Sequence, residues 1–326
     1  MATILVTGGA GFIGSAIVEA LVAQGQEVRL LDNFATGKRD NLDHVRGRIR
    51  VIEGDVRDPV TVRLAMADVD FVLHQAALSS VARSVVDPVT TAEVNIQGTL
   101  NVLMAARDAR VRRVVFAGSS SVYGDNPELP KRENANPMPR SPYAITKLAG
   151  EHYCRVFYEL YGLPTVVLRY FNVYGPRQRP DSQYAAVIPK FIDALLHGQR
   201  PVIYGDGKQS RDFTYVSNVV QANLLACQAN DAPGEVVNIA CGSRISLLDL
   251  LQLLRDQTGS GVEPELAAPR PGDVTHTLAD ISRAEHLLGY RPQVDMREGL
   301  RRTIEWHRGR LAFAGLAQAH ALGTSA

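Results

Sequence analysis

The sequence predicts an α/β protein whose core is a doubly wound parallel sheet, with a smaller C-terminal α/β domain for a substrate. In the first half of the chain, short apolar segments alternate with amphipathic helical ones, which is the pattern of a parallel sheet covered by helices on both faces. A glycine-rich turn follows the first apolar segment, whereas prolines and short apolar segments at 201–204 and 236–239 mark the second half. With 326 residues, 45% of them hydrophobic, the chain can form one large domain or two closely joined domains.

The first strand is expected at residues 4–6 and leads into the glycine turn. Gly8, Gly11 and Gly14 are spaced Gly-x-x-Gly-x-x-Gly, and a helical segment begins at Ser15. Glycines at this spacing let the backbone turn tightly, approach a pyrophosphate and bring the helix close to the strand. A Rossmann-type dinucleotide site is therefore predicted.

A second strand is expected at residues 28–31 and ends at Asp32. This is the expected distance from the glycine turn for a carboxylate that binds the adenine ribose diol. Because a carboxylate at that place would repel a 2′-phosphate, we predict NAD and not NADP as the cofactor. The alternative is a helix-capping turn followed by a surface aspartate, but strand, turn, helix and acid occur here together.

Further strands are expected at residues 49–52, 71–73, 114–117 and 166–169. Ligands bind outside the carboxyl ends of the strands in sheets of this kind. Small or polar residues that follow these ends are Asp55, Val56, His74, Gln75, Ala76, Ala77, Ser119, Ser120, Ser121 and Asn172. For His74 we expect a hydrogen-bonded side chain packed behind the cofactor and not a catalytic group.

Ser119, Tyr143 and Lys147 carry the predicted chemistry. A Tyr and a Lys four residues apart on a helix share a face, so the ammonium can favour the phenolate form and make Tyr143 a general base. The hydroxyl of Ser119, from a nearby strand end, could bind the same substrate oxygen and pass its proton to the phenolate. Oxidation of an alcohol to a ketone is implied.

In the second half, the string 204–216 is expected to form a loop and strand that present Arg211 inward, and Arg270 opens another polar string. Guanidinium groups match phosphate oxygens in bidentate fashion, so the two side chains could clamp a diphosphate. Taken alone, either arginine is more often an ordinary surface residue.

The expected domain division follows from the difference in sequence pattern between the two halves of the chain. An NAD-binding domain is expected at 1–175 with return segments near 214–241, and a substrate domain mainly at 176–307. The tail at 308–326 is expected to be a helix extension or a loose end.

Composition narrows the class of partner. The formal net charge is +1 and Lys and Arg form no run, which argues against nucleic acid. Cys154, Cys227 and Cys241 lie far apart without Cys-x-x-Cys spacing, as expected for buried thiols in a reducing compartment without a metal site. No apolar run approaches membrane-spanning length and no signal segment begins the chain. We expect a soluble cytoplasmic protein that acts on a small molecule.

Taken together, the motifs resemble those of the extended short-chain dehydrogenase/reductases, and among these the nucleotide-sugar 4-epimerases. The similarity extends from Met1 to about Trp306 and includes the glycine turn, the Asp32-Asn33 pair, Tyr-x-x-x-Lys, the string 169–176 and the strings around Arg211 and Arg270. The resemblance implies a tightly held NAD, a UDP-sugar substrate and a homodimer that pairs through two helices per subunit, one of which carries the Tyr and the Lys.

Motifs and resemblance together give the expected site residues. The cofactor residues are Gly8, Gly11, Phe12, Ile13, Gly14, Asp32, Asn33, Asp55, Val56, Gln75, Ala76, Ala77, Asn95, Tyr143 and Lys147. The substrate residues are Ser79, Ser119, Ser120, Ser121, Tyr143, Asn172, Ala186, Val187, Ile188, Tyr204, Gln209, Arg211, Arg270, Asp273 and Thr277. By resemblance, Asn95 supports the active-site helix, 186–188 border the nucleobase, and Arg211 and Arg270 hold the diphosphate.

The mechanism implied by the resemblance is a reversible transfer of a hydride between the sugar and NAD. Tyr143, with Ser119, removes the proton of the sugar C4 hydroxyl while the C4 hydride moves to NAD. The 4-keto sugar then turns about its link to the anchored diphosphate and receives the hydride on its other face. Lys147 is expected to bind the nicotinamide ribose and to favour tyrosinate.

Two places bear on the choice of reaction and substrate. Related 4,6-dehydratases have an Asp-Glu pair, and decarboxylases a Glu, where this chain has Ser120 and Ser121, which fits an epimerase; Ser120 could equally serve only to satisfy backbone groups. Thr277 falls where glucose-specific epimerases often have a bulky Tyr, so room for an N-acetyl group is expected. This favours UDP-N-acetylglucosamine, with UDP-glucose and UDP-galactose also accepted. The alternatives are a UDP-glucuronate 4-epimerase and a non-catalytic dinucleotide sensor, which typically lacks the Tyr or the Lys.

Overall fold

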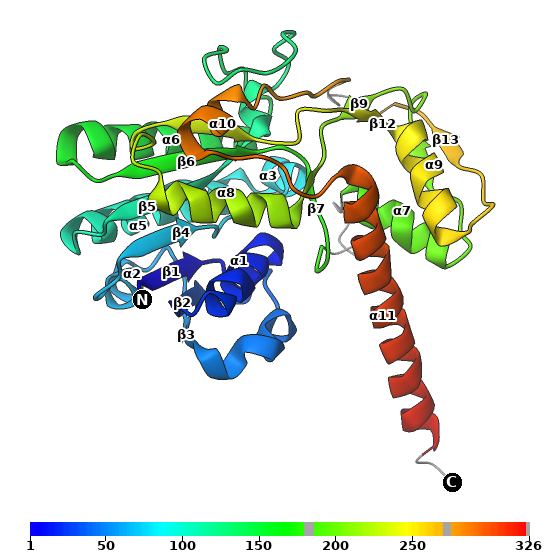
Figure 1. Cartoon of the computed structure of the whole chain (residues 1–326), viewed down its shortest axis with the longest axis horizontal. Coiled ribbons are helices and arrows are strands. Elements are labelled where there is room, and N and C mark those ends of the chain that lie inside the picture. Colours follow the sequence, from blue (N-terminus) through cyan, green and yellow to red (C-terminus); the bar gives the residue numbers. More distant parts are fainter. Residues whose placement is uncertain (179–185, 270–274, 324–326) are drawn as a thin grey trace.

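A seven-stranded parallel sheet forms the centre of the molecule (Figure 1). The computed structural model describes residues 1–178, 186–269 and 275–323, with side chains described up to residue 312. The sheet has the order β11-β6-β5-β4-β1-β2-β3, and every pair of neighbours is parallel. Its strands are β1 (Thr3–Thr7), β2 (Glu27–Asp32), β3 (Ile49–Glu53), β4 (Phe71–His74), β5 (Arg113–Ser119), β6 (Thr165–Tyr170) and β11 (Val236–Ile239). The predicted fold class is confirmed, and each strand predicted for the first half lies in this sheet.

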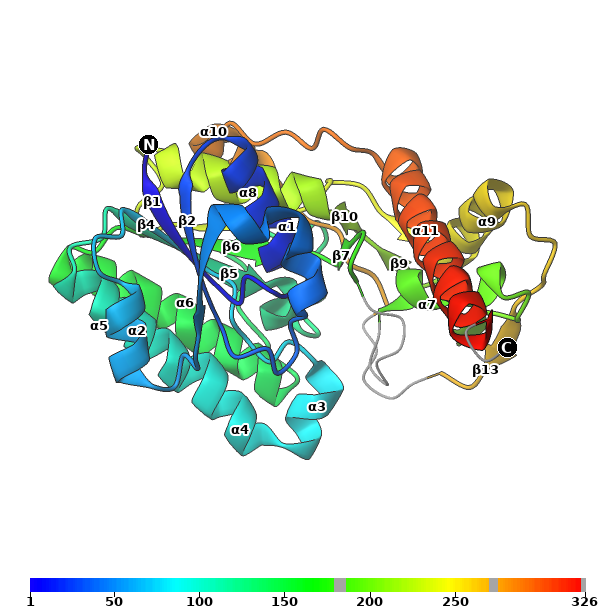
Figure 2. The same ribbon diagram turned by 90° about the horizontal axis from the view of Figure 1, so that it is seen from below.

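Helices cover both faces of the sheet, as Figure 2 shows. One face carries α1 (Phe12–Ala23), η1 (Arg39–Arg48), α8 (Val216–Gln228) and α10 (Ser282–Leu288), and the other carries α2 (Pro59–Ala65), α5 (Gly98–Asp108) and α6 (Pro142–Tyr161). Successive residues of β1 enter the two cores, Leu5 on the α5 side and Val6 on the α1 side. Strands buried on both faces are continuously apolar, and this is why these segments are visible in the sequence.

The order of the strands reverses next to β1. The chain moves outward from β1 to β2 and β3, then crosses to β4, β5 and β6 on the other side. A crevice opens beyond the carboxyl ends of the strands at such a reversal. Short elements follow β4 and β5 there, namely α3 (Val81–Val86), α4 (Pro88–Ala92), the π-helical turn η2 (Glu93–Gln97) and η3 (Ser120–Tyr123).

The second half of the chain builds a smaller lobe beside the sheet (Figures 1 and 2). It contains α7 (Val187–Leu196), α9 (Leu247–Thr258), α11 (Met296–Gly323) and the short strands β7 (Val173–Tyr174), β8 (Val202–Tyr204), β9 (Ser210–Arg211), β10 (Thr214–Tyr215), β12 (Ile245–Ser246) and β13 (Glu265–Ala267). These strands pair two by two, β10 with β7, β12 with β9 and β13 with β8. A separate apolar core around Phe191, Leu250 and Ile304 holds the lobe together.

Segments of the second half also pack on the large sheet. β11 is one of its edge strands, and α8 packs into the core on one face. Ala284 and Leu288 of α10, together with Tyr290, pack into the same core. The expected domain boundaries stay a prediction. The tail is helical through Gly323 and extends α11 away from the body of the molecule (Figure 1).

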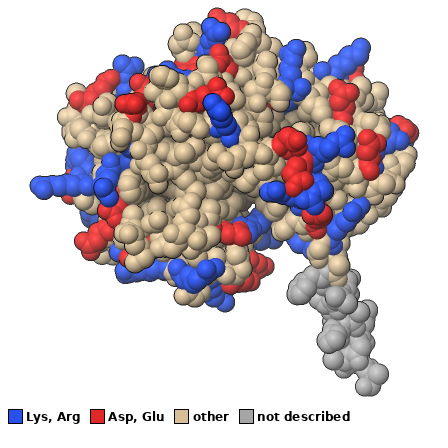
Figure 3. All heavy atoms as spheres, viewed as in Figure 1, with Lys and Arg blue, Asp and Glu red and all other residues tan. Residues whose placement is uncertain are grey.

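Within the described ranges, no helix is both long and apolar enough to cross a bilayer, and no group of His, Cys, Asp or Glu side chains is arranged to hold a metal ion. The three cysteines are unpaired. On the face shown in Figure 3, Lys and Arg are interspersed with Asp and Glu and do not form a patch of one sign.

Candidate active site

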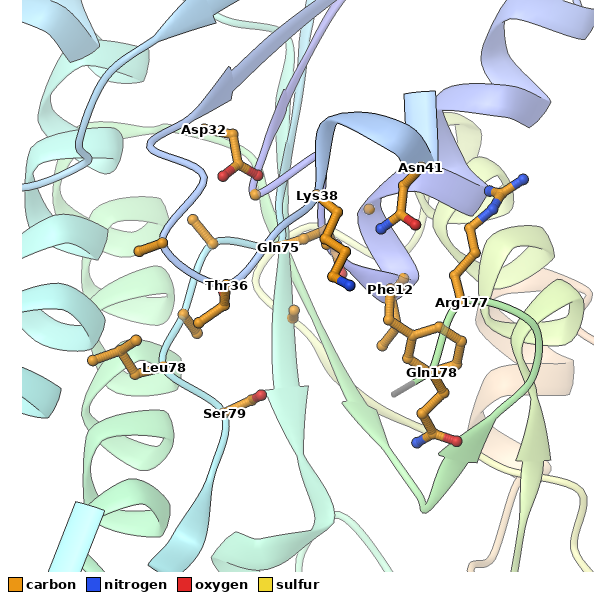
Figure 4. Close-up of a pocket in the computed structure, with 18 of the residues that line it drawn as sticks. Phe12, Asp32, Thr36, Lys38, Asn41, Gln75, Leu78, Ser79, Arg177 and Gln178 are labelled. Carbon is orange, nitrogen blue, oxygen red and sulfur yellow. The ribbon is translucent and has the colours of Figure 1, made fainter. Parts of the chain in front are cut away.

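A cavity of about 1340 Å³ opens at the carboxyl ends of the strands, where the strand order reverses. Figure 4 shows Asp32 and Ser79 on one side of it, with Phe12 and Gln178 facing them. The expected cofactor residues that line it are Gly8, Gly11, Phe12, Ile13, Gly14, Asp32, Asn33, Asp55, Val56, Gln75, Ala76, Ala77, Tyr143 and Lys147. The structure therefore brings the sequence-predicted cofactor residues to one cavity, apart from Asn95, which does not line it.

The glycine turn fits a pyrophosphate. Gly8 has a φ of +67°, and a Cβ placed there would lie 2.7 Å from the backbone of Ala76. A Cβ on Gly14 would lie 2.2 Å from the carbonyl oxygen of Gly8. Gly11 caps α1 without any side-chain hydrogen bond, so the helix presents backbone N–H groups to the cavity, as anion sites at helix N-termini do.

Asp32 lies at the end of β2, where an adenine ribose is expected. Its carboxylate accepts hydrogen bonds from the backbone N–H of Ala10 (2.9 Å) and of Phe34 (2.8 Å). Burial raises the pKa of this carboxyl, and the two backbone donors lower it. A carboxylate has about four acceptor positions, so capacity for a diol remains. These free acceptor positions fit the ribose diol of the nicotinamide dinucleotide predicted from the sequence.

Asp55 is held mainly by a partner that the sequence analysis missed. Arg57 makes two side-chain hydrogen bonds to its carboxylate, at 3.0 and 2.9 Å, and Asn33 donates a third at 2.8 Å. The hydrogen bonds from Arg57 lower the pKa of Asp55 to about 2. These contacts fix the loops after β2 and β3 relative to each other at the rim of the cavity.

His74 is a packed, hydrogen-bonded histidine, as predicted. Its Nδ1 lies 2.6 Å from the hydroxyl of Thr7, and its Nε2 lies 3.0 Å from the hydroxyl of Thr99. Burial, followed by the charge of Lys147, lowers its pKa to about 3. The next residue, Gln75, accepts from the phenol of Tyr170 at 3.2 Å and is thereby oriented at the cavity wall.

Tyr143 lines the cavity, and Ser119 interacts with its side chain. Tyr143 lies in the first turn of α6, and Ser119 ends β5. Burial raises the pKa of the phenol, whereas the interaction with the Ser119 hydroxyl lowers it. Ser121 donates its hydroxyl proton to the Ser119 hydroxyl at 2.9 Å. Ser120 begins the short η3 turn beside them and is partly buried.

Lys147 lies on α6 one turn after Tyr143. It lines the same cavity, and its ammonium donates to the carbonyl of Ala117 at 2.8 Å. Burial lowers its pKa to about 8, and Glu151 acts in the opposite direction. The effect of this ammonium on the Tyr143 phenol, expected from the four-residue spacing, stays a prediction.

Asn95 supports α6 from behind the cavity. Its side chain accepts from the backbone N–H of Leu78 (2.8 Å) and donates to the hydroxyl of Thr146 (3.0 Å). Thr146 in turn donates to the carbonyl of Tyr143 at 2.8 Å. Asn95 sits in the π-helical turn η2, a feature that is frequent at functional sites.

A second cavity, of about 270 Å³, lies in the smaller lobe. It is lined by expected substrate residues, Asn172, Ala186, Val187, Ile188, Tyr204, Gln209 and Arg211. Arg211 donates from Nη1 to the carbonyls of Ser210 and Thr275, both at 3.0 Å. Arg270 and Asp273 lie outside the described residues. Ser79 lines the large cavity instead.

Asn172 and Thr277 are in direct contact. The amide of Asn172 donates to the hydroxyl of Thr277 at 3.2 Å and to the carbonyl of Asp212 at 2.8 Å. Asp212, which the sequence analysis missed, is fully buried and accepts from the backbone N–H groups of Cys241, Gly242 and Ala279. Burial raises its pKa to about 6. No local pattern distinguishes such an aspartate, because its three partners come from distant segments.

Other cavity residues were also missed. Lys38, Asn41, Arg83, Arg177, Gln178 and Trp306 line the large cavity. Arg177 lies in the loop after β7 and forms an ion pair with Glu19 of α1 at 2.5 Å. This pair joins the two lobes beside the glycine turn.

Known proteins resemble this chain in sequence over most of its length. Residues 4–240 match the NAD dependent epimerase/dehydratase family. The chain belongs to that family. A putative UDP-glucose 4-epimerase of Methanocaldococcus jannaschii is 41% identical over 305 residues, which cover 93% of this chain and 97% of that protein. The expected resemblance to the extended short-chain dehydrogenase/reductases is confirmed.

Solved structures of epimerases share the whole fold with this family member. The UDP-N-acetylglucosamine 4-epimerase from Methanobrevibacter ruminantium, in complex with UDP-N-acetylmuramic acid, is 41% identical with a TM-score of 0.91, covering 95% of this chain and 99% of that one. The UDP-glucuronic acid 4-epimerase from Bacillus cereus, in complex with UDP-glucuronic acid and NAD, is 34% identical with a TM-score of 0.88, covering 94% of this chain and 99% of that one. The chain is an NAD-dependent enzyme of the epimerase class.

Proposed function

We propose that this enzyme is a UDP-sugar 4-epimerase and that it interconverts UDP-N-acetylglucosamine and UDP-N-acetylgalactosamine, with UDP-glucose and UDP-galactose as further substrates. The observation that carries the proposal is the interaction of the Ser119 hydroxyl with the phenol of Tyr143, which lines the large cavity. A hydroxyl pair of this kind can remove a proton from a sugar alcohol and return it.

Bound NAD would supply the acceptor and later the donor of the C4 hydride, together with a positive charge that favours tyrosinate. Tyr143 takes the proton of the C4 hydroxyl, and Ser119, oriented by Ser121, holds the same oxygen. Lys147 orients the cofactor ribose from the next turn of α6. When the sugar has presented its other face, Tyr143 returns the proton to the oxygen at C4.

The smaller lobe would hold the nucleotide. We assign the nucleobase to residues 186–188 and the diphosphate to Arg211, because both line the second cavity; Arg270 and Asp273 are assigned from the sequence alone. We keep 1–175 with 214–241 as the cofactor domain, with α10 added, and the rest up to 307 as the substrate domain.

The small side chain of Thr277 supports the N-acetylated substrate. Its hydroxyl is in contact with Asn172, a residue of the second cavity, and a threonine there leaves more space than a tyrosine would. A UDP-glucuronate 4-epimerase is the second candidate, favoured by the high structural similarity to the Bacillus cereus enzyme and by the three consecutive hydroxyls of 119–121.

The decisive experiment is incubation of the purified protein with UDP-N-acetylglucosamine, UDP-glucose and UDP-glucuronate, without added NAD, and separation of the products by chromatography. We expect the C4 epimer of the N-acetylated sugar at the highest rate. A product from glucuronate alone would retain the mechanism and replace the substrate. The absence of any C4 epimer would contradict the proposed function.

A further inference from the structure

Ser84, a buried residue of the short helix α3, contacts the backbone of the proposed base. Its hydroxyl accepts a hydrogen bond from the backbone N–H of Tyr143 at 3.0 Å. The same hydroxyl donates to the carbonyl of Val81 at 2.6 Å. Since a serine hydroxyl has one proton, its use on Val81 leaves only lone pairs for Tyr143. In this contact the N–H of Tyr143 is therefore the donor and the oxygen of Ser84 is the acceptor.

The first turn of α6 explains why an outside acceptor is needed. The first N–H groups of a helix have no partner within it. Pro142 occupies the first position and has no N–H, and Ser141, the N-cap, accepts with its side chain from Ala144 at 3.1 Å and with its carbonyl from Ile145. The N–H of Tyr143 is the donor that the helix's own cap does not satisfy, and Ser84 satisfies it.

Two hydroxyls therefore hold the backbone of Tyr143 from opposite sides. Ser84 binds its N–H, while Thr146, itself held by Asn95, binds its carbonyl. Ser84 is fully buried, so this contact is not exchanged for water. Ser80, the N-cap of α3, and Arg83 of α3 line the large cavity, so α3 joins the cavity wall to the start of α6.

We infer that Ser84 is a positioning residue of the epimerisation reaction, which holds the Tyr143 phenol in register with Ser119. The inference rests on the proposed function, in which Tyr143 is the base. Loss of the Ser84 hydroxyl would free the first turn of α6 and weaken the interaction of Tyr143 with Ser119. Because that interaction lowers the pKa of the phenol, its weakening would raise the pKa.

The test compares Ser84→Ala with the wild type on the UDP-sugar that is converted. We expect kcat to fall about tenfold, KM to stay within about twofold, and the acid limb of the pH profile to move to higher pH. Ser84→Cys, which keeps the volume but offers only a weak acceptor, should show the same changes without a cavity.

Thr165→Val is the matched control. Thr165 is also fully buried and also binds the backbone of α6, through the carbonyl of Cys154 at 2.8 Å, but that contact lies eleven residues after Tyr143, about 16 Å along the helix. This variant should lose stability and keep the wild-type kcat and pH profile.

A second measurement needs no substrate. In holoenzyme labelled with 13Cζ-tyrosine, the Tyr143 signal, assigned by its loss in Tyr143→Phe, should titrate at higher pH in Ser84→Ala. An unchanged titration, or an unchanged kcat and acid limb while Tyr143→Phe is inactive, would overturn the inference and leave the proposed function standing. Full activity in Tyr143→Phe would instead overturn the proposed base.

Discussion

At the scale of single residues, the phenol of Tyr143 is the decisive group. The side chain of Tyr143 is half-buried, the pKa of its phenol is raised by desolvation, and the interaction with Ser119 lowers it. We therefore expect a protonated phenol in the protein without cofactor, and a positive charge brought by NAD to favour tyrosinate. The binding of NAD and the generation of the base are then coupled.

Tyr143→Phe removes the phenolic oxygen and leaves the ring in place. We expect a loss of kcat of about 10³-fold or more, since both proton transfers depend on this oxygen, with NAD retention and UDP-sugar affinity near wild type. Rates come from epimer formation, and cofactor content from the absorbance of the denatured supernatant. A variant with near-normal turnover would show that another group is the base.

Thr277→Tyr would fill the space beside Asn172. We expect it to depress kcat/KM for UDP-N-acetylglucosamine at least tenfold while UDP-galactose is converted at close to the wild-type rate. Thr277→Ser, which keeps the hydroxyl, is the control. An equal loss on both sugars would place Thr277 away from the C2 substituent.

At the scale of elements, the close approach of α1 to the glycine turn after β1 determines the shape of the cofactor site. The strand β1, the glycine turn and α1 form one unit in which Gly14 brings the helix against the carbonyl of Gly8. Such contacts leave no room for a side chain, so the unit tolerates substitution only by moving the helix N-terminus.

Gly14→Ala places a methyl group where only 2.2 Å separates it from the Gly8 oxygen. We expect α1 to shift and the fraction of purified protein that retains NAD to fall at least tenfold. Gly47→Ala is the matched control, because a Cβ there has no atom within 4 Å. Equal NAD content in the two variants would mean that the helix N-terminus does not bind the pyrophosphate.

At the scale of the whole molecule, α5 and α6 lie side by side on the outside of the sheet (Figure 2) and leave apolar side chains in solvent. Met104 of α5 is 43% exposed, and Ile145 and Val156 of α6 are 53% and 40% exposed. Ile145 and Val156 are eleven residues apart and share a face of the helix. We propose this face as the interface of the expected homodimer.

Val156→Glu should convert the dimer to a monomer, since it introduces a charge at a surface that would otherwise be buried. The fold should remain intact because Val156 is exposed in the single chain. Light scattering after size-exclusion chromatography gives the mass directly. A wild-type protein that is already monomeric, or a variant that stays dimeric, would contradict the proposed interface.

Much of this enzyme could be predicted from its sequence, because the features concerned are local. Strands buried on both faces appear as continuous apolar runs. The glycine turn, Asp32 at the end of the next strand, and the spacing of Tyr143 and Lys147 are each fixed within a few residues of chain. The packed state of His74 also followed, once the proton chemistry had been assigned elsewhere.

Only the tertiary structure decided the contacts that join distant segments. Asn33 after β2 binds Asp55 after β3, Arg177 reaches Glu19 across the two lobes, and Ser84 reaches the N–H of Tyr143. The ammonium of Lys147 binds the carbonyl of Ala117, a residue of another element. Periodicity and spacing report which face of an element a residue occupies. They do not report which partner, many residues away, the fold brings to that face.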